Sequence, residues 1–257
     1  MNAATGWRPL LGQATLREHI AQVYQDEHFL ADVVSEYVAG ALRHGQAALL
    51  ITTAAHRRLF EAALGAAGVD MAAAAARRQV VFLDAERMLE ELMHGGMPEA
   101  RAFRGGLGDA VTALGLQYPA VRAYGEMVDL LWQQERRDAA ACLEQHWNDL
   151  LGVQAFSLLC AYRIDNLDAG SYGGPLERVC QAHTHLIPAR DYARFDDAVA
   201  QAARDALDEP LSQMLLALAA SSRPGADMPL GQAALLWLKK NMPLTADKVL
   251  AGARARC

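Results

Sequence analysis

The sequence predicts an α/β fold, a three-layer domain with a mostly parallel sheet, followed by a helical C-terminal region. Short apolar runs alternate with longer segments of helical periodicity between residues 19 and 163, which is the rhythm of βαβ units. The 257 residues are 53% hydrophobic and 21% charged, which is typical of one large globular domain with or without an appendage. Beyond Arg163 the strand pattern stops and helical periodicity takes over.

Five apolar runs predict strands, and the last of them is the most hydrophobic. The predicted strands are residues 19–24, 47–52, 80–84, 121–124 and 156–162.

Capping residues and glycines mark the ends of the helices between these strands. Asp26 is expected to cap a helix that runs to about His44 and stops at Gly45, and Thr53 to cap a second helix that ends before Gly68. The further predicted helices are residues 85–94, 99–116, 127–151 with a break near 135–138, 188–208, 210–220, 230–241 and 245–256. Residues 165–174 are expected to form a loop and residues 221–227 a linker.

The basic residues exclude several kinds of chemistry. The only three lysines, Lys239, Lys240 and Lys248, lie near the C-terminus, so the body of the chain offers no P-loop lysine and no Schiff-base lysine. The Gly-rich phosphate-binding motifs and the G-x-S-x-G motif are also absent, which excludes an ordinary P-loop NTPase and disfavours a serine hydrolase.

The tail from residue 229 carries a net charge of +4 against −6 for the whole chain, so residues 1–228 carry −10 and are a poor binder of nucleic acid. The tail helices could form a DNA-binding helix-turn-helix, but we favour a helical hairpin that docks on the domain or on a second subunit.

The sequence contains no apolar run long enough to span a membrane and begins with no secretory signal, so we expect a cytoplasmic protein. The four cysteines are widely spaced and are expected to be reduced.

The carboxyl ends of the predicted strands are where a doubly wound sheet binds its ligand. Glu126 directly follows a buried strand, where burial would make it a base or a ligand acceptor, although an acid at this position can also stabilise the start of the next helix. Asp84 and Glu86 are likewise either site residues or simple caps. The predicted ligand-binding residues are Tyr24, Glu27, His56, Asp84, Glu126 and Tyr162.

A weaker candidate site is a metal site at Cys180, His183 and His185, to which Cys160 could add a fourth ligand. The spacing is unlike a zinc signature, because His185 points away from the helix face that Cys180 and His183 share. A structural role is therefore favoured for these residues.

The chain resembles the MEDS domain, the sensory domain of methanogens and methylotrophs that is named after the regulator DcmR. The resemblance covers about residues 17–190 and rests on runs in the same order, among them GEM at 125–127, WN-x-L at 147–150 and LLCAY at 158–162. The remaining runs are residues 19–27, 42–46, 53–56, 82–86, 96–98 and 183–188.

The resemblance implies a RecA- and KaiC-like fold that lacks the nucleotide-binding loop. It also implies a sensor of the kind found in bacterial or archaeal regulators, which is often attached to histidine kinases or to DNA-binding regions. Only some 18 residues precede the first predicted strand and no kinase follows, so we expect a stand-alone sensor. Its sensory domain would be residues 1–190, and residues 191–257 would be a docking or output extension.

These observations predict a non-catalytic module that binds a small-molecule signal and acts through contact with a histidine kinase or another regulator protein. An enzyme that uses Glu126 with a histidine, a metal protein, and a structural adaptor with a vestigial pocket are the alternatives. A homo-oligomer is compatible with the fold, and the sequence identifies no cofactor.

Overall fold

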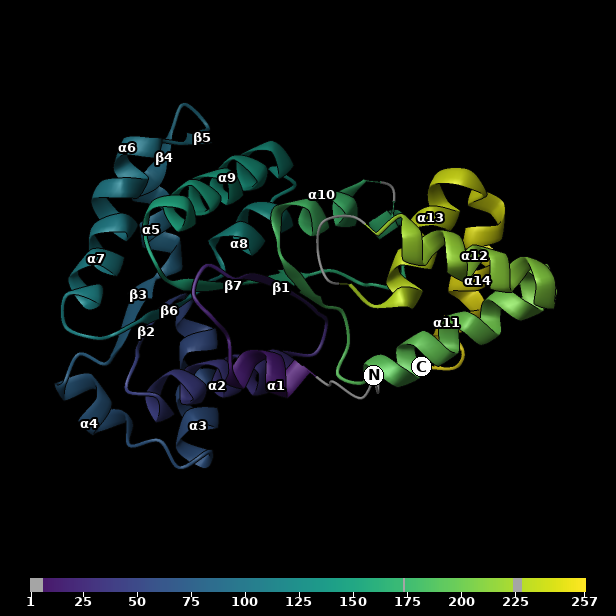
Figure 1. The fold of residues 1–257 in the computed structure, drawn as a ribbon. Coiled ribbons are helices and arrows are strands. Elements are labelled where there is room, and N and C mark those ends of the chain that lie inside the picture. The colour runs from purple at the N-terminus through teal and green to yellow at the C-terminus, as the bar shows by residue number, and fades with distance from the viewer. Residues whose placement is uncertain (1–6, 173, 224–227) are drawn as a thin grey trace. The chain divides into compact units, whose positions relative to one another are not determined.

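The computed structural model describes residues 7–172, 174–223 and 228–257, which form two compact units. The first, here called the sheet unit, consists of Trp7–Gln22 and Asp26–Arg163. The second, here called the helical unit, contains Val23–Gln25 and the described part of Ile164–Cys257. Figure 1 follows the chain through both units.

A six-stranded sheet has the order β3-β2-β6-β7-β1-β8 and confirms the predicted α/β class. β2 is parallel to β3 and β6, and β6 is parallel to β7. The strands are β1 (His19–Tyr24), β2 (Ala47–Thr52), β3 (Val80–Asp84), β6 (Val121–Gly125), β7 (Ser157–Arg163) and β8 (His185–Ile187).

The inner strands are buried along nearly their whole length. Every residue of β1, β2 and β6 is buried, as are the first six residues of β7. Only Val80 is buried in β3, which is an edge strand. A strand covered on both faces is largely apolar, and runs of mostly apolar residues therefore located these elements within one residue. His19, Gln22 and Arg122 are buried polar exceptions within them.

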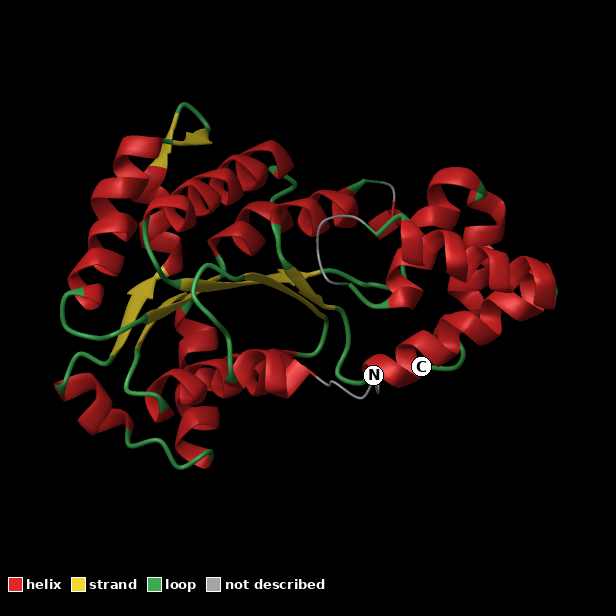
Figure 2. Ribbon diagram, in the orientation of Figure 1, coloured by secondary structure: helices red, strands yellow, loops and turns green. Residues whose placement is uncertain are grey.

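Helices cover both faces of the sheet in the sheet unit, with α1, α2 and α3 on one side and α5, α7, α8 and α9 on the other (Figure 2). Asp26 and Thr53 cap α2 and α3 as predicted, because their side chains accept from the amides of His28 and His56. The helices are α1 (Trp7–Gly12), α2 (Glu27–Arg43), α3 (Ala54–Ala66), α4 (Met71–Ala76), α5 (Ala85–Leu92), α6 (Ala100–Phe103), α7 (Asp109–Gly115), α8 (Met127–Gln133) and α9 (Arg137–Val153).

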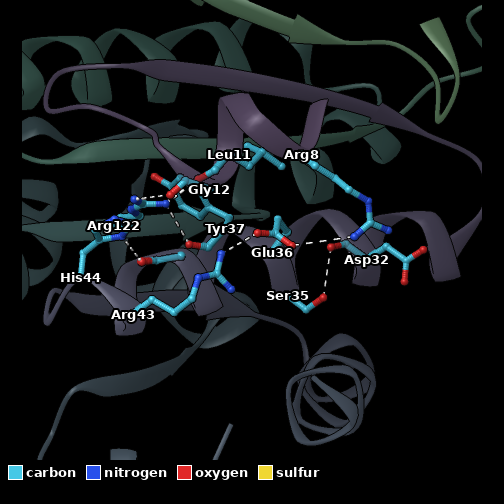
Figure 3. A network of polar contacts seen from close by, with 11 residues as sticks. Arg8, Leu11, Gly12, Asp32, Ser35, Glu36, Tyr37, Arg43, His44 and Arg122 are labelled. Carbon is cyan, nitrogen blue, oxygen red and sulfur yellow. Dashed lines mark hydrogen bonds and ion pairs between the residues drawn. The ribbon is translucent and has the colours of Figure 1, made fainter. Parts of the chain in front are cut away.

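A buried arginine fastens α1 to the sheet. Arg122 on β6 is 3% exposed, and its guanidinium donates to the carbonyl oxygens of Leu11, Gly12 and Tyr37 (Figure 3). It also donates to the side-chain oxygen of Gln46. These carbonyls satisfy a cation that would otherwise be costly to bury.

The long helix predicted over residues 99–116 is wrong as one regular element. α6 and α7 are separated by a π-helical turn at Arg104–Gly108, where three glycines and the wider turn interrupt the α pattern. A short hairpin of β4 (Met93–His94) and β5 (Met97–Pro98) precedes it and was not predicted.

The helical unit differs from its prediction at its start. β8 is a three-residue strand in a segment where we expected only loop and helix, and the helix predicted from residue 188 begins at Tyr192, with Asp191 as its cap. Three residues are too few to show strand periodicity. The predicted linker lies partly outside the described residues, which omit 224–227. The helices are α10 (Pro175–Ala182), α11 (Tyr192–Leu207), α12 (Glu209–Ser221), α13 (Leu230–Asn241) and α14 (Pro243–Arg254), with a 3₁₀ turn at Ala169–Tyr172.

No described helix has both the length and the apolar character needed to cross a membrane.

Candidate functional site

Two neighbouring parallel strands end side by side and place the candidate site. Ile51 of β2 is in register with Gly125 of β6, and the amide of Glu126 donates to the carbonyl of Ile51 over 3.1 Å. Glu126 therefore lies beside Thr53, which begins α3.

Each carboxylate oxygen of Glu126 has its own partners. Oε1 accepts from the backbone amide of Thr53, and Oε2 lies 2.7 Å from Nδ1 of His56 and 3.1 Å from the hydroxyl of Tyr124. Glu126 is 2% exposed. The buried carboxylate is thus held by donors from the β2–α3 turn, from α3 and from its own strand.

Aromatic rings fix the imidazole of His56. Its ring stacks on Phe60 at a centroid distance of 5.7 Å, and Phe60 packs edge-on against Tyr124 at 5.3 Å. The His56 side chain is 15% exposed against 3% for Glu126, so the imidazole is the more accessible member of the pair.

The two groups shift each other's pKa in opposite directions. The hydrogen bond from His56 to Glu126 is the largest influence on the imidazole and raises its pKa, although burial opposes it. Burial raises the pKa of Glu126, but the hydrogen bond and the charge of His56, with the Thr53 amide, outweigh it, so that the pKa of the carboxyl is lowered. The imidazolium–carboxylate form is therefore favoured.

Two more carboxylates act on His56 electrostatically. Glu27, at the start of α2, and Asp129, in the first turn of α8, both help to raise its pKa. Asp129 also accepts from the amide of Arg163 over 2.9 Å, which ties α8 to the end of β7. Three acids therefore act on one imidazole.

Sequence reasoning missed Asp129. Asp129 could have been placed near Glu126 from the sequence, because it follows Glu126 by three residues in the first turn of a predicted helix.

The other predicted ligand residues lie elsewhere. Asp84 is exposed and caps α5 by accepting from the amide of Arg87 over 2.9 Å, and Glu86 lies in the first turn of that helix. Tyr162 is buried on β7, where its hydroxyl donates to Glu144. Tyr24 is buried and belongs to the helical unit. The structure thus brings Glu27, His56 and Glu126 together.

The weaker metal candidates lie in the helical unit. Cys180 is on α10, His183 follows that helix, and His185 begins β8. Nδ1 of His183 lies 2.6 Å from the carbonyl of Val179, and burial raises the pKa of the Cys180 thiol to about 12. A metal site at these three residues stays a prediction.

Gln22 on β1 is a further polar residue that sequence reasoning overlooked. It is fully buried, and neither its Nε2 nor its Oε1 has a hydrogen-bond partner among the described residues. A buried amide in this state is costly, and a bound molecule would remove the cost.

A groove of about 190 Å³ lies between α6 and α9. Its lining includes Phe103, Arg104, His146, Leu150 and Val153. None of the predicted ligand residues lines this groove.

Comparison with known proteins identifies the family. No curated protein and no solved structure matches the chain. The family model that describes the methanogen/methylotroph, DcmR sensory domain matches residues 18–184, close to the span over which the resemblance was expected. This match covers more than half of the chain, and the protein therefore belongs to the MEDS sensory domain family.

Proposed function

We propose that this chain is a non-catalytic signal-sensing module of a bacterial regulatory pathway, which binds a small molecule where β2 and β6 end. The observation that carries the proposal is the pairing of buried Glu126 with the more accessible His56 at this edge of the sheet. Membership of a sensory family supports the sensing role. A ligand that meets His56 would change the environment of Glu126 and hence the contacts of the β2–α3 turn.

The charges favour one class of ligand. Glu27, Glu126 and Asp129 outnumber the single imidazole, so the site carries a negative charge whether or not His56 is protonated. A small molecule with a positive charge or several hydrogen-bond donors is complementary to such a site, whereas an anion is not.

The output is proposed to be a protein contact made by residues 191–257, with residues 1–190 as the sensory part. Leu211, Met214 and Leu218 are exposed on α12 at helical spacing and form an apolar stripe. A histidine kinase or another regulator that presents an amphipathic helix would fit this stripe. The basic tail would add attraction to an acidic partner.

The test is a thermal-shift screen of the full chain with a panel of small amines, alcohols and carboxylic acids. We expect an amine or a neutral donor to raise the melting temperature of the wild type and of Glu61→Gln, which alters an exposed carboxylate on α3 that pairs with Arg57. Glu126→Gln should remove the shift while the protein stays folded by circular dichroism. An equal shift in Glu126→Gln would refute the proposed site.

Other outcomes separate the alternatives. Loss of the shift in Arg104→Ala, with retention in Glu126→Gln, would place the ligand in the groove beside α6. Consumption of the ligand would favour the enzyme that uses Glu126 with a histidine. Ordered self-assembly without any ligand response would favour a structural adaptor.

A further inference from the structure

A second polar cluster lies inside the sheet unit, away from the Glu126 site. His19 begins β1, Cys160 lies in β7, and Glu144 lies in the middle of α9. β1 and β7 are neighbours in the sheet. All three side chains are buried, with exposed fractions of 2%, 0% and 4% for His19, Cys160 and Glu144.

The potential ligand atoms face one another at distances that suit a metal ion. Nε2 of His19 lies 3.2 Å from Oε2 of Glu144 and 3.4 Å from Sγ of Cys160, and the sulfur lies 3.9 Å from the same carboxylate oxygen. A tetrahedral zinc ion would separate its nitrogen and oxygen ligands by about 3.4 Å, and its sulfur from either of them by about 3.6 Å. Each observed distance is within about 0.3 Å of that geometry.

The outer contacts orient the same atoms toward the centre of the cluster. Nδ1 of His19 lies 2.9 Å from Oδ1 of Asn148, so Nδ1 carries the proton and the lone pair of Nε2 faces Glu144 and Cys160. Asn148 follows Glu144 by one helical turn and shares its face of α9. The other carboxylate oxygen, Oε1 of Glu144, accepts from the hydroxyl of Tyr162. Metal-binding histidines and carboxylates are held by outer partners of this kind.

The charges of the cluster also favour a cation. Glu144 is a buried carboxylate that lies against an imidazole, a thiol and a phenol. A divalent ion would neutralise the carboxylate and a cysteine thiolate together. One imidazole nitrogen, one thiolate and one carboxylate oxygen form a mixed ligand set that suits zinc better than calcium or magnesium.

We propose that His19, Glu144 and Cys160 supply three of the ligands of a transition-metal site, with zinc as the preferred ion, and that Asn148 and Tyr162 position them. On binding, the cysteine thiol releases its proton and no redox change is needed. This site is independent of the proposed ligand site, since it shares none of the groups around Glu126.

Cobalt(II) reports directly on such a site because thiolate ligation gives an intense charge-transfer absorption. The full chain, stripped with a chelator, is titrated with Co²⁺ and then with Zn²⁺ as competitor. We expect one equivalent of Co²⁺ to produce the band and one equivalent of Zn²⁺ to abolish it. Absence of the band, or of metal binding by mass spectrometry, in the folded wild type would overturn the proposal.

Variants identify the ligands. Cys160→Ser should remove the band, whereas Cys142→Ser, which alters the half-buried thiol of α9 near His146, should retain it. Asn148→Ala keeps all three ligands and should weaken metal affinity about 10- to 100-fold. Should Cys160→Ser not fold, Asn148→Ala decides the matter, because unchanged affinity in that variant would contradict the proposed geometry. Neither result bears on the amine response tested with Glu126→Gln.

Discussion

The Nδ1 atom of His56 lies 2.7 Å from the Oε2 atom of Glu126, across 70 residues of sequence. This contact joins the first turn of α3 to the residue that follows β6, and its strength depends on the protonation of both groups. Because the pair lies where β2 and β6 end, a change in it would affect the connections that follow both strands.

The pair predicts a pH-dependent stability. The pKa of His56 is raised in the folded state, so its contribution is fully present below its ordinary pKa of about 6.5 and is lost as the pH rises through the folded value. The pKa of Glu126 is lowered, so its contribution is present above about 4.5 and is lost as the pH falls through the folded value. We expect His56→Gln, which keeps a donor but cannot be charged, to lower the free energy of unfolding by roughly 1–3 kcal/mol near pH 5.5 and by less near pH 9.

Urea unfolding at the two pH values measures this difference. Arg57→Gln is the matched control, because it breaks an exposed ion pair with Glu61 on the same helix and should cost about 0–1 kcal/mol at both pH values. Equal losses for His56→Gln at both pH values would show that the imidazole is not charged in the folded protein.

Arg122 predicts a second, larger effect. Its guanidinium is buried among the carbonyl oxygens of Leu11, Gly12 and Tyr37. We expect Arg122→Ala to lower the free energy of unfolding by about 3–5 kcal/mol, because three carbonyl oxygens lose their donor and a packed side chain is removed. Limited proteolysis should show earlier cleavage near Gly12, and cleavage at the wild-type rate would contradict the role of Arg122 in holding α1.

Gly40 tests the same contact from the helix side. A Cβ at this position would lie 2.8 Å from Nη1 of Arg122 and 3.0 Å from the carbonyl oxygen of Gly12. We expect Gly40→Ala to be destabilising even though alanine is the better helix former. Gly65→Ala, in the open on α3, should be neutral or stabilising, and thermal unfolding of the two variants compares them. A melting temperature for Gly40→Ala at or above that of Gly65→Ala would mean that the end of α1 does not lie so close to Gly40 on α2.

The sequence located elements whose cause is local and missed those whose cause is distant. Runs of mostly apolar residues predicted the buried strands. The side chains of Asp26 and Thr53 are of the kind that caps helices, and this alone predicted the starts of α2 and α3. Glu27, His56 and Glu126 could be grouped because parallel strands end at a common edge. The grouping of His19 with Cys160 could not be foreseen, since it depends on β1 lying beside β7, and strand order is set by packing of the whole sheet. The π-helical turn at Arg104–Gly108 was missed as well, because glycines in a helical segment indicate a weak helix but not whether its turn is α or π.

Replacing Gln22 is expected to raise the stability of the protein and to weaken ligand binding. Its amide is fully buried in β1 and has no hydrogen-bond partner among the described residues, so the folded protein bears the cost of removing it from water. Gln22→Leu has a similar volume and removes that cost, and we expect the free energy of unfolding to rise by about 1–3 kcal/mol. If the amide is retained because a bound molecule satisfies it, the same variant should lose the ligand-induced thermal shift while it gains stability. Ala21→Gly, at the neighbouring buried position of β1, should lower stability without removing the shift. A loss of stability in Gln22→Leu would show instead that the amide is satisfied within the folded chain, and it would then be a structural group rather than part of a binding site.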